Sequence, residues 1–139
     1  MPKFNKTTFV ELRNFLYNSY DHDANIKSIT CDYENKSIEI SLFNAFFGVK
    51  INYIFHFVEV VLSIKGSWNG DQTEIIGITA EEDFSYLKKH LSNHSEYNQN
   101  SLYLLFQMFS GDELHIVSKE VTIEITPMES DETGDSFLS

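Results

Sequence analysis

The chain has 139 residues and a formal net charge of −11 at pH 7, a length that suits one domain with a substantial hydrophobic core. Apolar residues make up 42% of the sequence, with only two prolines and six glycines, which excludes a disordered or fibrous chain. The single cysteine, Cys31, excludes an internal disulfide framework and a cysteine-based zinc ribbon.

The first expected elements are a helix and a β-hairpin. Residues 8–20 are predicted to form the helix, because Thr8 and Glu11 have capping-box spacing ahead of an apolar stripe. Residues 25–33 and 37–43 alternate apolar and polar side chains and are separated by a short polar turn. They are therefore predicted to form the two arms of the hairpin.

The longest apolar run, residues 49–65, is the expected centre of the fold. Its alternation changes parity between Phe57 and Val58, and a strand changes parity only at a bulge or a bend. Seventeen extended residues would span roughly 55 Å, whereas a compact chain of this size is about 37 Å across. We therefore expect the run to bend near Phe57 and to fold back or coil within a sheet.

The second half continues the antiparallel pattern. Asn69-Gly70 predicts a tight turn before a strand that ends near residue 79, and Thr79 with Glu82 predicts the start of a second helix. Strands follow at 102–109, expected to be covered on both faces, and at 114–126. The expected fold is α+β, with two helices and a bent, largely antiparallel sheet of about seven strands in the order α-β-β-β-β-β-α-β-β. Residues 1–126 form one domain in this interpretation, and residues 127–139 form a disordered acidic tail.

The acidity is not confined to the tail. The tail holds four acids and no base, and subtracting these four leaves −7 on the preceding residues. This charge opposes binding to a phosphate backbone, so no nucleic-acid partner is expected. It favours solubility and a basic protein partner.

The cluster Asp21-His22-Asp23 is the most polar segment at an element boundary. A histidine flanked by carboxylates is typical of a metal or acid–base site. Such residues also cap the backbone where a helix gives way to a strand. Both interpretations stay open, and the three residues are kept as candidate binding residues.

Other candidates carry weaker signals. Trp68, before the Asn69-Gly70 turn, is a candidate interface anchor or a residue that closes the core. His90 and His94 have zinc-ligand spacing but lack the glutamate of the H-E-x-x-H pattern. Cys31 alternates with apolar neighbours and is interpreted as a small buried hydrophobe. No nucleophile, phosphate-binding or dinucleotide motif is present, so catalytic residues, a metal and a cofactor are not expected.

The chain shows neither a signal peptide nor a membrane span. The N-terminus lacks an uninterrupted apolar core, and Lys50, Asn52, His56, Glu59 and Ser63 interrupt the central run. We therefore expect a cytoplasmic protein with no membrane contact.

A family resemblance adds to these observations. Residues 20–26 read YDHDANI, Ile38, Ile40 and Leu42 alternate in the hairpin that follows, and later matches extend to about residue 125 (Phe57, Val60, and Gly111 before LHIV at 114–117). This succession resembles a group of small bacterial β-rich domains in which an HDA segment leads into the first antiparallel strand. Members are mostly uncharacterised, and some are classed as immunity proteins of polymorphic toxin systems. The resemblance implies a non-enzymatic protein that binds and blocks a toxin.

The sequence and the resemblance together are compatible with three functions. The first is an interaction protein, most concretely an immunity protein with a basic toxin as partner. The second is a small-ligand binding module, in which the bent sheet encloses a cavity lined by aromatic residues (Phe43, Phe46, Phe47, Tyr53 and Phe55). The third is an enzyme that uses the Asp21-His22-Asp23 cluster. The oligomeric state and the identity of the partner stay open.

Overall fold

The computed structural model describes residues 2–66, 73–91 and 100–128. The predicted Asn69-Gly70 turn, Trp68, His94 and the tail from residue 129 lie outside the described residues. The elements follow in chain order: β1 (Lys3–Asn5), a 3-10 turn η1 (Lys6–Thr8), α1 (Phe9–Tyr17), β2 (Asn25–Asp32), β3 (Ser37–Asn44), β4 (Val49–Ile64), β5 (Ile75–Glu81), α2 (Ser85–Leu91), β6 (Leu102–Met108) and β7 (Glu113–Pro127).

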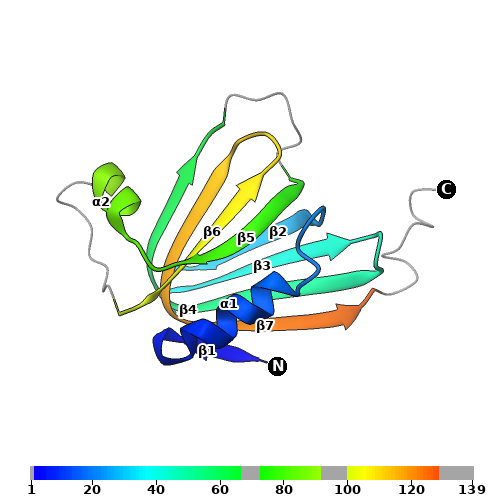
Figure 1. Ribbon diagram of the computed structural model, residues 1–139, viewed down its shortest axis with the longest axis horizontal. Helices are drawn as coiled ribbons and strands as arrows, with labels where there is room; N and C mark the ends of the chain where they lie inside the picture. Colours follow the sequence, from blue (N-terminus) through cyan, green and yellow to red (C-terminus); the bar gives the residue numbers. More distant parts are fainter. Residues whose placement is uncertain (1, 67–72, 92–99, 129–139) are drawn as a thin grey trace.

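These strands form a seven-stranded antiparallel sheet, which confirms the α+β prediction. The order is β2-β3-β4-β7-β6-β5, and β1 pairs with β7. The sheet curves strongly without closing into a barrel (Figure 1). Its two edge strands meet at one end only, through a bridge between Asn25 and Glu74 and a hydrogen bond from the Ile26 N–H to the Thr73 carbonyl oxygen at 2.9 Å.

The bend lies where the parity change predicted it. Phe57 has a φ of 56°, and the β4–β7 register shifts between Val58 and Val60. A positive φ is costly for a residue with a side chain, and here the bulge bends the long strand. The Val58 N–H donates to the Lys36 carbonyl oxygen at 2.8 Å, so the β2–β3 turn closes against the bend. The central run is therefore one bent strand, β4, which pairs with β3 over its first half and with β7 over nearly its whole length.

The core lies on both faces of this sheet. The larger cluster fills the concave side, where Tyr53, Phe55 and Phe106 pack ring to ring and α1 buries Phe9, Leu12 and Leu16. On the opposite face, α2 packs a smaller cluster over β6 and β7 (Val60, Phe84, Leu87, Tyr103 and Val117). Strand β6 contributes Leu104 to the first cluster and Tyr103 to the second, which confirms that this strand is covered on both faces.

Four local predictions were wrong. Cys31 was interpreted as a small buried hydrophobe, but its side chain is exposed on the outer strand β2. Helix α1 begins at Phe9 without a side-chain cap from Thr8, and the preceding Asn5 instead caps η1. The pair Thr79 and Glu82 does not open a helix, because Thr79 lies inside β5. Asp83 caps α2 instead, and its Oδ1 accepts a hydrogen bond from the Ser85 N–H at 2.8 Å. The sequence interpretation also omitted β1 and reached seven strands by dividing β4 in two.

Candidate functional site

Of the predicted cluster, Asp21 points into the protein. It is 3% exposed, and its Oδ2 accepts hydrogen bonds from the Tyr53 hydroxyl at 2.6 Å and from the Ser19 hydroxyl. Its Oδ1 is buried without a hydrogen-bond partner among the described residues. Burial raises the pKa of Asp21 above its ordinary value, although both hydroxyls oppose this shift by donating to the carboxylate. Asp21 therefore ties the segment after α1 to the centre of β4 and is not available to a partner.

His22 and Asp23 lie at the surface. Their Nδ1 and Oδ2 atoms are 3.1 Å apart, and both side chains are more than half exposed. The backbone at Asp23 has a φ of 67°, and its N–H donates to the Ile75 carbonyl oxygen at 2.9 Å. The strained turn is thus held by β5, and it presents the imidazole and the carboxylate side by side to solvent.

Asn44, at the end of β3, joins this segment to the β3–β4 turn. Its amide nitrogen donates to the carbonyl oxygens of Tyr20 at 2.9 Å and His22 at 3.3 Å. Its Oδ1 accepts from the N–H groups of Phe46 at 3.1 Å and Phe47 at 3.3 Å. An asparagine amide has two N–H donors and two acceptor lone pairs, so one side chain that is 1% exposed is fully used in fixing two loops.

The fixed loops carry exposed aromatic rings. Phe46 is 87% exposed, Phe47 56% and Tyr20 40%. The ring centroids of Tyr20 and Phe47 are 5.1 Å apart, and those of Phe46 and Phe47 are 4.9 Å apart. We call Tyr20, His22, Asp23, Phe46 and Phe47 the aromatic loop surface. Two of the predicted site residues, His22 and Asp23, therefore lie on the same pair of joined loops as three exposed aromatic side chains.

Sequence reasoning missed the exposure of these rings. Phe46 and Phe47 were expected to line a cavity with Phe43, Tyr53 and Phe55, but Tyr53 and Phe55 are fully buried in the core. The five residues do not share one cavity. The signal that was available is the position of two phenylalanines inside a turn that ends at Gly48, which has a φ of 67°. A turn of this kind leaves its side chains at the surface.

A second polar cluster lies on the opposite face of the sheet, beneath α2. The His115 side chain is 1% exposed, with its Nδ1 2.6 Å from the Tyr103 hydroxyl and its Nε2 3.0 Å from the Glu113 Oε1. If Nε2 carries the proton that Glu113 accepts, Nδ1 is left to accept the Tyr103 proton. The ring of Tyr86 stacks on His115 at 5.2 Å.

This cluster borders a cavity of about 250 Å³, whose lining includes three carboxylates and three rings (Glu81, Asp83, Glu113, Tyr86, Tyr103 and His115). Burial raises the pKa of Tyr103, and the negative charges of Glu81 and Glu113 raise it further. The phenol therefore stays protonated and acts as a hydrogen-bond donor. The arrangement suits the binding of a small polar group.

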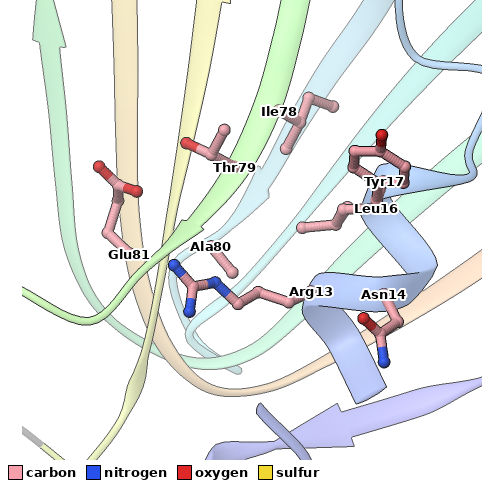
Figure 2. A pocket seen from close by; sticks show the side chains of 8 residues that line it. All are labelled: Arg13, Asn14, Leu16, Tyr17, Ile78, Thr79, Ala80 and Glu81. Carbon is pink, nitrogen blue, oxygen red and sulfur yellow. The ribbon is translucent and has the colours of Figure 1, made fainter. Parts of the chain in front are cut away.

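A third hollow, of about 440 Å³, separates α1 from β5. Figure 2 shows Arg13 reaching from α1 toward β5, with Tyr17 at the other end of the hollow. The guanidinium of Arg13 lies 2.7 Å from the Glu82 carboxylate and 5.3 Å from the centre of the Phe9 ring. Since its one basic group is already engaged, we interpret this hollow as the seam between a helix and an edge strand.

The described ranges, residues 2–66, 73–91 and 100–128, carry neither a metal-site signal nor a membrane-span signal. Within these ranges, no group of three or more histidine, cysteine or carboxylate side chains is placed to hold a metal ion. No helix there is long and apolar enough to cross a membrane. His90, which has zinc-ligand spacing with His94 in the sequence, donates from Nδ1 to the Tyr86 carbonyl oxygen at 3.0 Å, while His94 lies outside the described residues.

Comparison with models of known protein families gives no match to this chain. Comparison with curated proteins gives no match either.

Proposed function

We propose that this protein is a non-enzymatic interaction protein that binds a basic protein partner through the aromatic loop surface. The observation that carries the proposal is the rigid exposure of Phe46, Phe47 and Tyr20 around the buried Asn44. Exposed aromatic rings in mutual contact are a feature of binding surfaces, because such rings supply most of the energy at interface hot spots.

The rigidity of the surface supports binding rather than a role in packing. The backbone of both loops is already ordered by the four hydrogen bonds of Asn44 and by the hydrogen bond from Asp23 to Ile75. A partner that docks there does not have to order these loops, so less of the contact energy is lost to conformational entropy. Without a partner, the three exposed rings keep apolar surface in contact with water, which is unfavourable.

The charge of the chain supports a basic partner. A net charge of −11 attracts a positively charged protein over long distances and raises the rate of association. On the same segment as Tyr20, the exposed Asp23 carboxylate is available to a lysine or arginine at the rim of the contact. Together with the sequence resemblance, this favours an immunity protein that occludes a toxin in the bacterial cytoplasm.

The test is co-expression with the product of the adjacent gene, followed by measurement of growth and of complex formation with purified proteins. We expect rescue of growth by the unchanged protein. A Phe46→Ala/Phe47→Ala double variant should bind at least about 30-fold more weakly, the equivalent of one hot spot of about 2 kcal/mol.

Tyr33→Ala is the matched control, because Tyr33 is also an exposed aromatic residue, at 90%, but lies at the opposite end of the β2–β3 hairpin. It should bind and rescue like the unchanged protein. A toxic adjacent product that this protein neither binds nor neutralises would contradict the immunity role. Equal binding by the double variant would contradict the assignment of the surface.

A second candidate function is the binding of a small ligand in the cavity beneath α2. The buried Tyr103–His115–Glu113 chain favours it, because three groups with fixed donors and acceptors border a space of about 250 Å³. Native mass spectrometry of the purified protein tests this function. A retained ligand that is lost in a Tyr86→Ala variant would support it, and an unliganded mass would favour the interaction protein.

A further inference from the structure

Among the residues that the structure describes, no strand covers the outer edge of β2 beyond its first residues. Among the described strands β2 pairs only with β3 along its length, and the bridge to Glu74 covers only its first residues. Every residue from Ser28 to Asp32 is exposed, including Ile29 at 49%. An exposed edge of this kind presents unpaired backbone N–H and C=O groups and is a template for another strand.

Two features of the structure limit the open segment to five residues. At one end, the β2–β3 register shifts between Ile26 and Ser28, and the Ile26 N–H is already bonded to the Thr73 carbonyl oxygen. At the other end, the strand stops at Asp32, whose carboxylate accepts hydrogen bonds from Asn35 in the following turn. The middle of the open segment is therefore Thr30.

The side chains of the open segment alternate in chemistry. Ile29 and Cys31 pair with Ile40 and Ile38, whose side chains are in the core, so they share the core face of the sheet. Ser28, Thr30 and Asp32 occupy the other face. The segment thus has one apolar face and one polar face, and its middle residue is a threonine.

This pattern is complementary to itself. When two such segments run antiparallel with Thr30 opposite Thr30, Ile29 of each copy lies opposite Cys31 of the other, and Ser28 lies opposite Asp32. Directly opposite residues share a face of the sheet, and this register keeps apolar residues with apolar and polar with polar. Moving the register by one residue would place Ile29 opposite Thr30 and mix the two faces.

The charge of the hairpin permits the contact. Residues 25–44 contain three acids and two bases (Asp32, Glu34, Glu39, Lys27 and Lys36), so the hairpin carries only −1 of the net charge of −11. Two copies that approach through β2 therefore bring together weakly charged parts of an acidic chain. A second copy is thus a better fit to this edge than the strongly basic partner proposed above for the aromatic loop surface.

We propose that the open edge of β2 binds a second copy of this chain, with Ser28–Asp32 of the two copies paired antiparallel about a two-fold axis at Thr30. The two sheets then continue into each other, and Ile29 and Cys31 become covered. The aromatic loop surface lies at the other end of the hairpin, where Asn25 pairs with Phe43, so both copies keep it accessible.

The test is disulfide cross-linking of the full chain in a Cys31→Ser background. In the proposed register, the two Thr30 Cα atoms are about 4.5–5.5 Å apart, within the range that a disulfide spans. A Thr30→Cys variant should therefore form a covalent dimer under mild oxidation. Ser28→Cys is the matched control on the same strand face, because its two copies are separated by four residues along the strands, roughly 13 Å.

We expect the Thr30→Cys variant to cross-link at least about tenfold faster than the Ser28→Cys variant, since only the former satisfies disulfide geometry. Adding Ile29→Lys should remove this difference, while Val10→Lys, at another exposed apolar position, should leave it intact. Equal rates for the two cysteine variants, or faster cross-linking through Ser28, would overturn the proposal. Circular dichroism of each variant confirms that the fold is retained.

Discussion

Two regions of this protein place a buried polar network beneath exposed rings, and they differ in what the network holds. Beneath the aromatic loop surface, Asn44 bonds to backbone groups of two loops that have no strand partner at those positions. Beneath α2, Tyr103 and His115 belong to paired strands, and their hydrogen bond joins side chains whose backbones the sheet already fixes. A polar side chain therefore determines loop conformation in the first region and only cavity chemistry in the second.

The largest expected effect is that of Asn44→Ala. It removes four hydrogen bonds, and at about 0.5–1.5 kcal/mol for each the free energy of unfolding should fall by about 2–6 kcal/mol. Urea denaturation measures this change. Asn52→Ala is the control, because the Asn52 side chain accepts one described hydrogen bond, from the Ser41 hydroxyl at 2.7 Å, and should cost about 1 kcal/mol. Equal losses for both variants would contradict the role of Asn44 as the loop anchor.

The next comparison is between two buried tyrosines. Tyr53→Phe removes a donor from the Asp21 carboxylate, whose second oxygen has no partner among the described residues. Tyr103→Phe removes a donor from His115, whose Nε2 keeps its contact with Glu113. Leaving a buried polar group short of hydrogen-bond partners costs about 1–3 kcal/mol, whereas a typical hydrogen bond contributes about 0.5–1.5 kcal/mol. Denaturation at pH 7 should therefore show the larger loss for Tyr53→Phe, and the reverse order would contradict this account of Asp21.

The pH dependence of stability sharpens the same contrast. Because burial raises the pKa of Asp21 in the folded state, the folded protein binds this proton more tightly than the unfolded chain does. Stability from this group is fully present below the unfolded pKa, about 3.9, and is lost as the pH rises through the folded pKa. Asp21→Asn removes the titration, so the stability of the unchanged protein relative to this variant should fall as the pH rises. Denaturation curves between pH 4 and 7 measure the difference, and a constant difference would contradict the raised pKa.

Local patterns in the sequence were enough to predict the strands and the bend. The parity change between Phe57 and Val58 required a bulge, and the bulge is there. Strand β1 was missed because three residues carry no usable alternation and are defined only by their pairing with β7. The capping-box spacing of Thr79 and Glu82 gave a wrong helix start, because the same spacing also occurs at the end of a strand. Thr79 lies inside β5, which continues to Glu81.

The candidate site was less predictable, because it depends on contacts between distant residues. The segment Asp21-His22-Asp23 was identified by its polarity, but whether each side chain is buried depends on residues far along the chain. Asp21 meets Tyr53, 32 residues away, and the Asn44 amide reaches back 24 residues to the Tyr20 carbonyl oxygen. Neither contact has a local signal. The exposure of Phe46 and Phe47 follows from the second contact, so it was equally hidden.

The smallest expected effect on stability is that of Phe46→Ala, which tests whether this ring is needed for the fold or only for binding. Phe46→Ala removes a ring that is 87% exposed, and surface substitutions of this kind usually change the free energy of unfolding by less than about 0.5 kcal/mol. Urea denaturation should show a midpoint close to that of the unchanged protein, even though the same substitution weakens binding in the double variant. A loss above about 1 kcal/mol would mean that Phe46 supports the fold through its contact with Phe47 at 4.9 Å. A midpoint close to that of the unchanged protein would mean that the fold does not need the Phe46 ring, in agreement with a role of this ring in binding.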